Sequence, residues 1–366
     1  MNDILIGLAE RVRQAAAAKA ILRIRGGATK QSMAGVISDA ATLDMRSYAG
    51  IVDYAPSELV ITARAGTPLV EIEKVLAERG QCLPFDPPRF ADADGRLSGT
   101  VGGMVASGLA GPGRAAAGGV RDYVLGVQLV NGRGEAMVFG GQVMKNVAGY
   151  DVSRLMAGAM GTLGLIVEVS LKVLPRAPAE ATLRFEMPQA QALERLNAWG
   201  GKPLPLNASC WVEEAGAGTL YLRLRGAQAA VQAASRTLGG ELQPDAAAEW
   251  TQCREQQLPW FTERAGRDLW RLSVPQTAPV LDVPEPPLIE WHGAQRWVAG
   301  DRADADALRR VAAAAGGHAT LFRAAGAQDV PRFAPPQPPL DRIQRELKQQ
   351  FDPAGIFNRG RLFPGF

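Results

Sequence analysis

Three glycine-rich segments constrain the fold of this chain more than any other feature of its sequence. The first, "RGGATK", begins at Arg25 and follows a run of alternating apolar and basic residues that is typical of a strand. The second runs from Gly99 to Arg114, and the third from Lys145 to Val173, with a glycine-rich turn at Gly161 to Gly164. Glycine lets a backbone approach a ligand closely and adopt positive φ. Three such segments, each beside a predicted strand, favour one extended ligand in the N-terminal half.

The first segment has the chemistry of an anion site. Successive backbone N–H groups around a short turn form a concave nest, and the Thr29 hydroxyl and Lys30 ammonium would lie beside it. No Gly-Lys-Ser/Thr follows, and the pattern is not G-x-G-x-x-G, which excludes a Walker loop and a Rossmann fingerprint. A phosphate or diphosphate suits this turn. The alternative is a Gly-Gly turn that binds nothing.

The other two glycine-rich segments extend this prediction. We expect the Gly99–Arg114 segment to be a loop instead of a helix or strand, because of its glycine and serine content. In the third segment a polar helix ends and the chain runs directly into a strand. Together the three segments favour a dinucleotide with a diphosphate at its centre, either a flavin or a nicotinamide cofactor.

The length of 366 residues favours two domains, and the composition changes near Pro175 and Pro178. Strands mixed with helices precede this linker. Two β-α-β-β-like units follow it, which predicts an antiparallel sheet with helices on one face. A proline-rich connector then leads to a helix and an aromatic tail, which we expect to dock on the first domain. We therefore predict domains at residues 1–176 and 177–330, with residues 331–366 returning to the first.

Composition excludes several classes of function. A net charge of +3 without a basic stripe argues against nucleic-acid binding. Cys82, Cys210 and Cys253 have neither disulfide-scaffold nor zinc spacing, so no metal site is predicted and a reducing compartment is expected. The N-terminal segment lacks the apolar core of a signal peptide, and no run is long and apolar enough to insert into a membrane. We expect a cytoplasmic protein, held at the inner face of a membrane only through partner subunits.

The order of the motifs resembles a known family. The matching segments are "RGGATK", "ARAGTPLVEIEKVLAERG", "LPFDPP", "KNVAGYDVSRLMAGAMGTLGLIVEVSLKVLPR" and "FDPAGIFNRGRL". They resemble the PCMH-type FAD-binding fold of the vanillyl-alcohol-oxidase family and, within it, the smaller FAD-binding subunits of bacterial glycolate oxidase (glycolate dehydrogenase) complexes. The resemblance implies an α+β fold, in which a two-part FAD-binding domain carries a C-terminal antiparallel-sheet cap with ferredoxin-like units.

The same resemblance implies a set of cofactor contacts. Arg25 to Lys30 would hold the FAD pyrophosphate, and the Gly161 turn would hold the adenosine end. The full set is Arg25, Gly26, Gly27, Ala28, Thr29, Lys30, Pro84, Phe85, Gly99, Thr100, Gly102, Gly103, Gly108, Gly161, Thr162, Gly164, Ile166 and Asn358. We expect the FAD to be non-covalent, because a histidyl link needs a histidine in the first domain and both histidines follow residue 290.

No motif in the sequence identifies the catalytic residues. Lys145, Tyr150 and Asn358 are candidates for the flavin face, although Lys145 equally fits a solvated helix face and Tyr150 a core position. His292 and His318 stand alone, and isolated histidines are more often structural than catalytic. The chain therefore lacks the cluster of cap-domain histidines that related 2-hydroxy-acid dehydrogenases use.

Three functions are compatible with the sequence. The first is the FAD-binding subunit of a complex that oxidises glycolate, a small 2-hydroxy acid, to glyoxylate. Electrons would leave through a larger FAD-binding subunit and an iron–sulfur subunit, because no cysteine cluster lies in this chain. The second is a self-sufficient flavin oxidase or dehydrogenase of another small acid or alcohol. The third is a non-catalytic structural partner that has kept a flavin-type domain.

Overall fold

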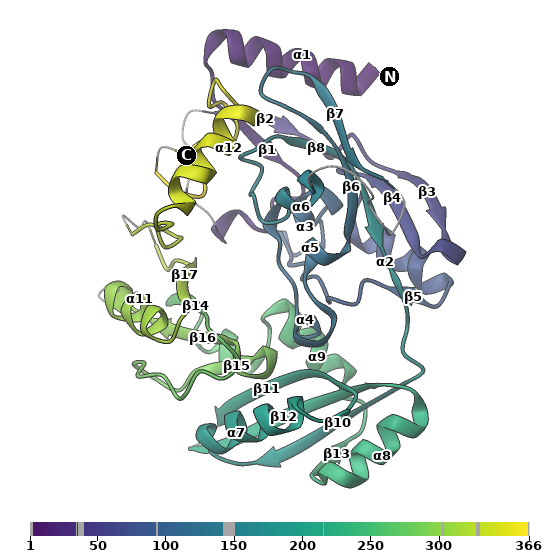
Figure 1. Ribbon diagram of the computed structural model, residues 1–366, viewed down its shortest axis with the longest axis vertical. Helices are drawn as coiled ribbons and strands as arrows, with labels where there is room; N and C mark the ends of the chain where they lie inside the picture. Colours follow the sequence, from purple (N-terminus) through teal and green to yellow (C-terminus); the bar gives the residue numbers. More distant parts are fainter. Residues whose placement is uncertain are drawn as a thin grey trace.

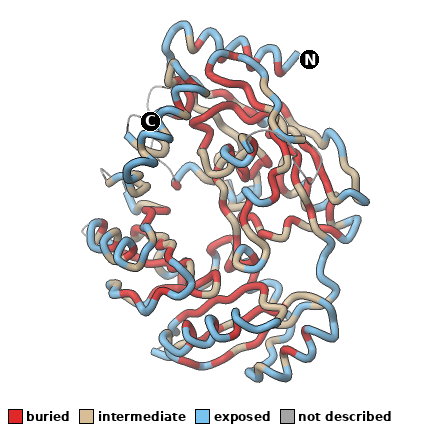
Figure 2. The backbone as a smooth tube through the Cα atoms, in the orientation of Figure 1, coloured by how far each residue is buried: buried red, intermediate tan, exposed pale blue. Residues whose placement is uncertain are grey.

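The computed structural model describes residues 3–33, 35, 40–92, 94–141, 151–214, 216–301, 304–326, 330–364 and 366. Two regions of sheet lie at opposite ends of the molecule in Figure 1. We call the first, with its helices and the C-terminal tail, the N-terminal part, and the second the cap part. Figure 2 shows that the buried backbone follows the strands of both regions, while the outer helices are exposed on one side.

A five-stranded antiparallel sheet forms the centre of the N-terminal part. Its order is β3-β4-β8-β6-β7. The strands are β3 (Ile51–Ala55), β4 (Val60–Arg64), β6 (Val124–Val130), β7 (Ala136–Gly140) and β8 (Leu165–Lys172). Strand β8 is buried along most of its length, because it lies between β4 and β6 and packs on both faces.

Smaller elements surround this sheet. Strands β1 (Leu22–Arg25) and β2 (Ala41–Asp44) form a parallel pair, and β5 (Gln81–Cys82) pairs with β9 (Leu174–Pro175). The helices are α1 (Asp3–Ala18), α2 (Leu69–Glu78), α3 (Val101–Ser107), α4 (Arg114–Ala117), α5 (Val120–Tyr123) and α6 (Val152–Leu155), with 3₁₀ turns η1 (Gln31–Met33) and η2 (Pro56–Glu58). Helix α1 buries one face, formed by Leu5, Leu8 and Val12, which recur at helical spacing.

Helix α3 corrects one expectation. The glycine content of the Gly99–Arg114 segment predicts a loop, but residues 101–107 are helical. Thr100 caps the helix, since its Oγ1 accepts a hydrogen bond from the Gly103 N–H at 3.2 Å. A Cβ on Gly102 would lie 2.7 Å from the Ala65 Cβ. Glycine is needed here for close packing of a helix against a strand end, which glycine content alone does not distinguish from a loop.

The cap part is one eight-stranded antiparallel sheet, ordered β13-β10-β12-β11-β15-β16-β14-β17. Both predicted β-α-β-β units contribute to it, and pairing of β11 with β15 joins them. The strands are β10 (Ala179–Glu186), β11 (Leu206–Glu214), β12 (Ala217–Gly226), β13 (Glu241–Gln243), β14 (Asp268–Ser273), β15 (Leu288–Glu290), β16 (Gln295–Gly300) and β17 (His318–Arg323).

Helices cover both faces of the cap sheet, not one face as expected. The outer face packs against α7 (Gln189–Gly200), α8 (Gln228–Leu238) and α11 (Ala305–Ala314). The inner face packs against α9 (Ala247–Glu255) and α10 (Pro259–Thr262), which supply Trp250 and Trp260. A 3₁₀ turn, η3 (Trp291–Gly293), joins β15 to β16. Alternate strand residues are apolar on each face, so both faces need a covering layer.

The inner face of the cap sheet also meets the N-terminal part. Leu109 and Met160 of the N-terminal part share an apolar cluster with Trp297 and Phe322 of the cap. Polar contacts reinforce this junction. The Trp291 Nε1 donates to the Gly111 carbonyl at 3.0 Å, and the Glu255 carboxylate accepts from the N–H groups of residues 89 and 90 at 2.9 and 2.8 Å.

The C-terminal tail docks on the N-terminal part, as expected. Helix α12 (Leu340–Phe351) packs Leu347 and Phe351 against the N-terminal core, whereas Leu340 and Ile343, at helical spacing from them, are exposed. After it, the Leu22 N–H donates to the Ile356 carbonyl at 2.8 Å. No helix in the described part of the chain is long and apolar enough to cross a membrane.

Candidate cofactor site

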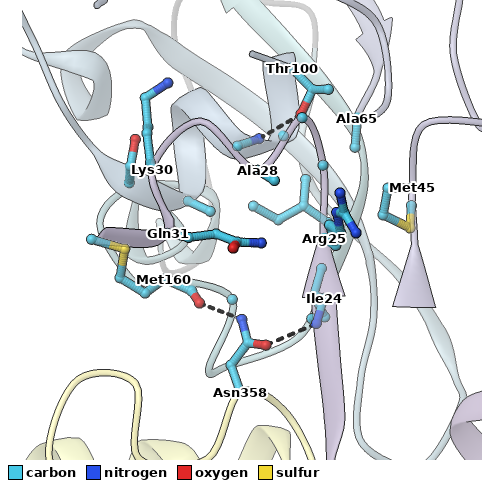
Figure 3. A pocket seen from close by; sticks show the side chains of 18 of the residues that line it. Ile24, Arg25, Ala28, Lys30, Gln31, Met45, Ala65, Thr100, Met160 and Asn358 are labelled. Carbon is cyan, nitrogen blue, oxygen red and sulfur yellow. Dashed lines mark hydrogen bonds between the residues drawn. The ribbon is translucent and has the colours of Figure 1, made fainter. Parts of the chain in front are cut away.

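A cavity opens where strand β1 ends, and three segments distant in sequence line it. They are the turn after β1, the start of α3 with the residues before it, and the turn that leads into β8. Figure 3 shows it. The lining residues are Arg23, Ile24, Arg25, Gly26, Gly27, Ala28, Thr29, Lys30, Gln31, Met45, Ala65, Gly99, Thr100, Gly102, Gly103, Ala106, Ser107, Met160, Gly161, Gly164, Ile166, Asn358 and Arg361. Of the residues predicted to contact the cofactor, 14 are in this set.

Two glycines after β1 let the first segment lie directly on the second. A Cβ on Gly27 would lie 1.6 Å from the Ser98 carbonyl oxygen, and one on Gly26 would lie 2.4 Å from the Thr100 Oγ1. The Ser98 hydroxyl donates to the Gly27 carbonyl at 2.9 Å and joins the segments. The glycines are therefore required for the walls of the cavity to meet, whatever it binds.

The donor set of the cavity suits an anion. Within the described structure, the backbone N–H groups of Gly27, Ala28 and Thr29 have no acceptor. Ala28 takes the left-handed conformation, with φ of 60°, which turns successive N–H groups toward one side. Arg23, Arg25, Lys30 and Arg361 line the cavity, whereas none of its described lining residues is acidic. Fixed dipoles and cations together favour a diphosphate.

Lys30 is the most strongly perturbed of these cations. Its Nζ donates to the Thr29 Oγ1 at 3.3 Å and lies 5.5 Å from the centre of the Phe90 ring. Burial lowers the pKa of Lys30 to about 8, although the nearby Glu255 carboxylate opposes the shift. An anion that paired with Lys30 would stabilise the charged form of its side chain.

Asn358 joins the tail to two walls of the cavity. Its Oδ1 accepts from the Ile24 N–H at 2.9 Å, and its Nδ2 donates to the Met160 carbonyl at 2.6 Å, as Figure 3 shows. Next to it, Gly161 has φ of 71°, and a Cβ there would lie 2.7 Å from the Asn358 Nδ2. Because both ends of its amide bond the backbone, Asn358 positions the cavity walls.

Four predicted contacts lie away from this cavity. Phe85 is fully buried in the N-terminal core, and Pro84 lines a separate groove between the two parts. Gly108 ends α3 and borders a neighbouring cavity. Thr162 is also buried, and its hydroxyl donates to the Ala159 carbonyl at 2.7 Å. The flavin-face candidates Lys145 and Tyr150 lie outside the described residues.

Sequence reasoning missed a buried ion pair behind the cavity. The Lys348 Nζ donates to the Thr162 carbonyl at 2.6 Å and to the Asp352 carboxylate at 2.7 Å. That carboxylate also accepts from the Ile356 and Phe357 N–H groups, at 3.1 and 2.8 Å. Burial lowers the pKa of Lys348, while Asp352 opposes the shift. The signal in the sequence is the i,i+4 pair of opposite charges at the end of a helix.

The histidines do not reach this cavity. The His292 ring is largely buried in the cap, where burial lowers its pKa to about 4, and its backbone N–H donates to the Ser209 hydroxyl at 2.9 Å. His318 begins β17, and burial also lowers its pKa. Within the described ranges, no group of three or more His, Cys, Asp or Glu side chains could hold a metal ion. Cys82, Cys210 and Cys253 are free thiols.

Comparison with known proteins defines the class. A family model described as an FAD binding domain matches residues 7–140. An alkyldihydroxyacetonephosphate synthase structure superposes with a TM-score of 0.64 at 15% identity, covering 96% of this chain and 73% of that chain, which shows a shared fold. The fold and the cavity are thus those of flavoproteins whose cofactor is FAD, and the cavity walls and donor set described above fit that cofactor.

The family follows from a close relative. The chain is 46% identical to the glycolate oxidase subunit GlcE of Escherichia coli (strain K12) over 361 residues, which is 99% of this chain and 98% of that protein. It belongs to the GlcE family. The glycolate oxidase subunit GlcD of Bacillus subtilis (strain 168) is 31% identical over 133 residues, 36% of this chain and 27% of GlcD. The predicted family, α+β fold class and FAD cofactor are confirmed.

Proposed function

We propose that this chain is the FAD-binding subunit of a glycolate oxidase complex and takes part in oxidising glycolate, a 2-hydroxy acid, to glyoxylate. The observation that carries the proposal is the cavity at the end of β1, which is lined by cations and free backbone N–H groups in a chain of the GlcE family. GlcE and GlcD are named as subunits of one oxidase, which supports a multi-subunit assembly.

Different residues of the cavity would contact different parts of FAD. Backbone N–H groups of Gly27, Ala28 and Thr29 would bind the diphosphate, and Lys30 would neutralise part of its charge. Gly103 and Gly161 leave room for the cofactor to lie against the backbone. Bound FAD supplies the two-electron acceptor for a CH–OH donor.

We further propose that the FAD is non-covalent. Neither histidine lines the cavity, and Cys82 lines a different groove. Acid precipitation of the purified chain should leave the yellow flavin in the supernatant. Flavin that stayed with the precipitated polypeptide would contradict this part of the proposal.

The electrons need a route out of this chain. We propose that they pass to partner subunits, a larger FAD-binding subunit and an iron–sulfur subunit, which would also hold the chain at the inner face of the membrane in the cytoplasm. The three cysteines of this chain supply no cluster spacing.

The test is to purify the complex with and without this chain, and to measure FAD content and glycolate-dependent dye reduction. We expect omission of the chain to lower the FAD content by the share that this chain binds and to abolish dye reduction, and re-addition of the FAD-loaded chain to restore both. A complex that lacks this chain and still oxidises glycolate at the full rate would overturn the proposed function.

A further inference from the structure

A second cavity lies beside the cofactor cavity, between the N-terminal part and the inner face of the cap sheet. It has a volume of about 380 Å³ and shares two wall residues, Ser107 and Met160, with the cofactor cavity. Several water molecules or one small organic ligand would fill it, since a water molecule takes about 30 Å³ of liquid. A ligand here would lie next to the cofactor.

An arginine without a counter-ion forms part of its wall. Arg271 lies on β14, in the middle of the strand, and its neighbours across the ladder are Trp297 and Thr320. It makes no hydrogen bond or ion pair within the described residues, and its Nε is buried. The centre of the Phe322 ring lies 5.8 Å from its guanidinium carbon. A buried guanidinium without a partner is costly, so its presence points to an anion that pairs with it.

The other charges around this cavity are mostly positive. The exposed Arg114 lines the cavity, with its guanidinium carbon 4.5 Å from the centre of the Trp291 ring, and Arg121 lines it too. Asp122 is the acidic residue among the described lining residues, and its Oδ2 already accepts the Gly119 N–H at 2.8 Å. Burial and the repulsion from Arg114 lower the pKa of Arg271 to about 10, which still leaves it charged at neutral pH.

We propose that Arg271 and Arg114 bind the carboxylate of a small 2-hydroxy acid in this second cavity, beside the cofactor. A guanidinium can donate two parallel hydrogen bonds to a carboxylate, which an ammonium cannot match. Leu109 and Phe322 on the wall limit the ligand to a short carbon skeleton. The choice of a 2-hydroxy acid rests on the proposed function, whereas the choice of a carboxylate rests on the two arginines.

The experiment measures binding instead of turnover. Oxalate, a small carboxylate that cannot be oxidised as a hydroxy acid, is titrated into the FAD-loaded full chain by calorimetry, with flavin absorbance followed in parallel. We expect binding by the wild type, with affinity reduced about tenfold or more in Arg271→Met and in Arg114→Met, and less in Arg271→Lys. Arg236→Met, which removes an exposed arginine of α8, is the matched control and should bind as the wild type does.

The thermal midpoint and FAD content of each variant separate a binding role from a structural one. If Arg271 only supported the fold, Arg271→Met would melt earlier or lose FAD. If it binds a carboxylate, the ligand-free variant keeps its FAD and melts at the wild-type temperature or above it, because a costly buried charge has been removed. The site is overturned if the wild type does not bind oxalate, or if Arg271→Met binds it unchanged. Oxalate binding that is intact in a complex unable to oxidise glycolate would instead reject the proposed function and leave the carboxylate site standing.

Discussion

Lys30 couples the affinity for FAD to pH. Its pKa of about 8 without ligand is lower than that of a free lysine because the ammonium is desolvated. A bound diphosphate favours the charged form and so raises this pKa. Binding is then strongest below the ligand-free pKa, and affinity is lost as pH rises from about 8 toward the higher pKa of the complex, by up to about tenfold per pH unit.

We therefore expect the dissociation constant of FAD, measured by flavin fluorescence, to stay level up to about pH 7.5 and to rise above about pH 8. Lys30→Arg should remove this rise, because arginine stays charged throughout. Lys30→Met should bind FAD more weakly at neutral pH and show no rise. A rise in Lys30→Met that equals that of the wild type would show that another group is responsible.

At the scale of elements, two adjacent glycines of helix α3 have different surroundings, so we expect substitutions at them to have different effects. A Cβ on Gly103 would meet only the Thr100 Oγ1, at 3.2 Å, so a side chain there extends into the cofactor cavity. We expect Gly103→Val to lose most of its bound FAD, while the thermal midpoint of its FAD-free form stays within about 2 °C of that of the FAD-free wild type.

Gly102→Val is the matched comparison. Its Cβ would lie 2.7 Å from the Ala65 Cβ, so the helix would have to move away from the strand end, at a cost of about 1–3 kcal/mol. Flavin absorbance and thermal melting of the two variants give the contrast. Equal destabilisation by both substitutions would contradict this division of roles.

Helix α12 contacts the turn that leads into β8 through Lys348, whose Nζ donates to the Thr162 carbonyl. Lys348→Met would leave the buried Asp352 carboxylate without its ammonium partner, and we expect unfolding free energy to fall by about 3–5 kcal/mol. Denaturant unfolding of the FAD-loaded chain measures this loss. Lys202→Met, at an exposed turn, should change stability by less than about 0.5 kcal/mol. A loss of that small size in Lys348→Met would show that the pair contributes nothing.

The elements were predictable where local sequence determines them. Helix α7 follows a proline and spans residues 189–200, where Leu193, Leu196 and Trp199 recur at helical spacing, a pattern that local sequence alone predicts. Helix α3 was not, because its glycine content hid the apolar residues Val101, Met104 and Val105. The Ile24–Asn358 contact spans 334 positions of the chain, so its partner was beyond any local pattern. Family resemblance, not periodicity, indicated Asn358.

At the scale of the whole molecule, the cofactor cavity lies within the N-terminal part, whereas the second cavity lies where the two parts meet and depends on that junction. The Glu255 carboxylate from α9 holds the backbone of residues 89 and 90, and the Arg223 guanidinium from β12 pairs with Asp86 at 2.5 Å. The domain boundaries at residues 176 and 330 stay predictions, because contacts such as these join the two parts.

The arrangement predicts how the chain behaves without partners. Removing the proton from a substrate hydroxyl needs a base tuned near working pH, and histidine is the usual source. The pKa of His292 is about 4, and neither histidine borders either cavity.

The isolated, FAD-loaded chain should therefore bind small carboxylates yet reduce its flavin with glycolate very slowly, because a partner must complete the site. Anaerobic bleaching of the flavin by glycolate, for the isolated chain beside the complex, measures this difference. Bleaching of the isolated chain at the rate of the complex, lost in His292→Ala or His318→Ala, would instead make this chain a self-sufficient enzyme.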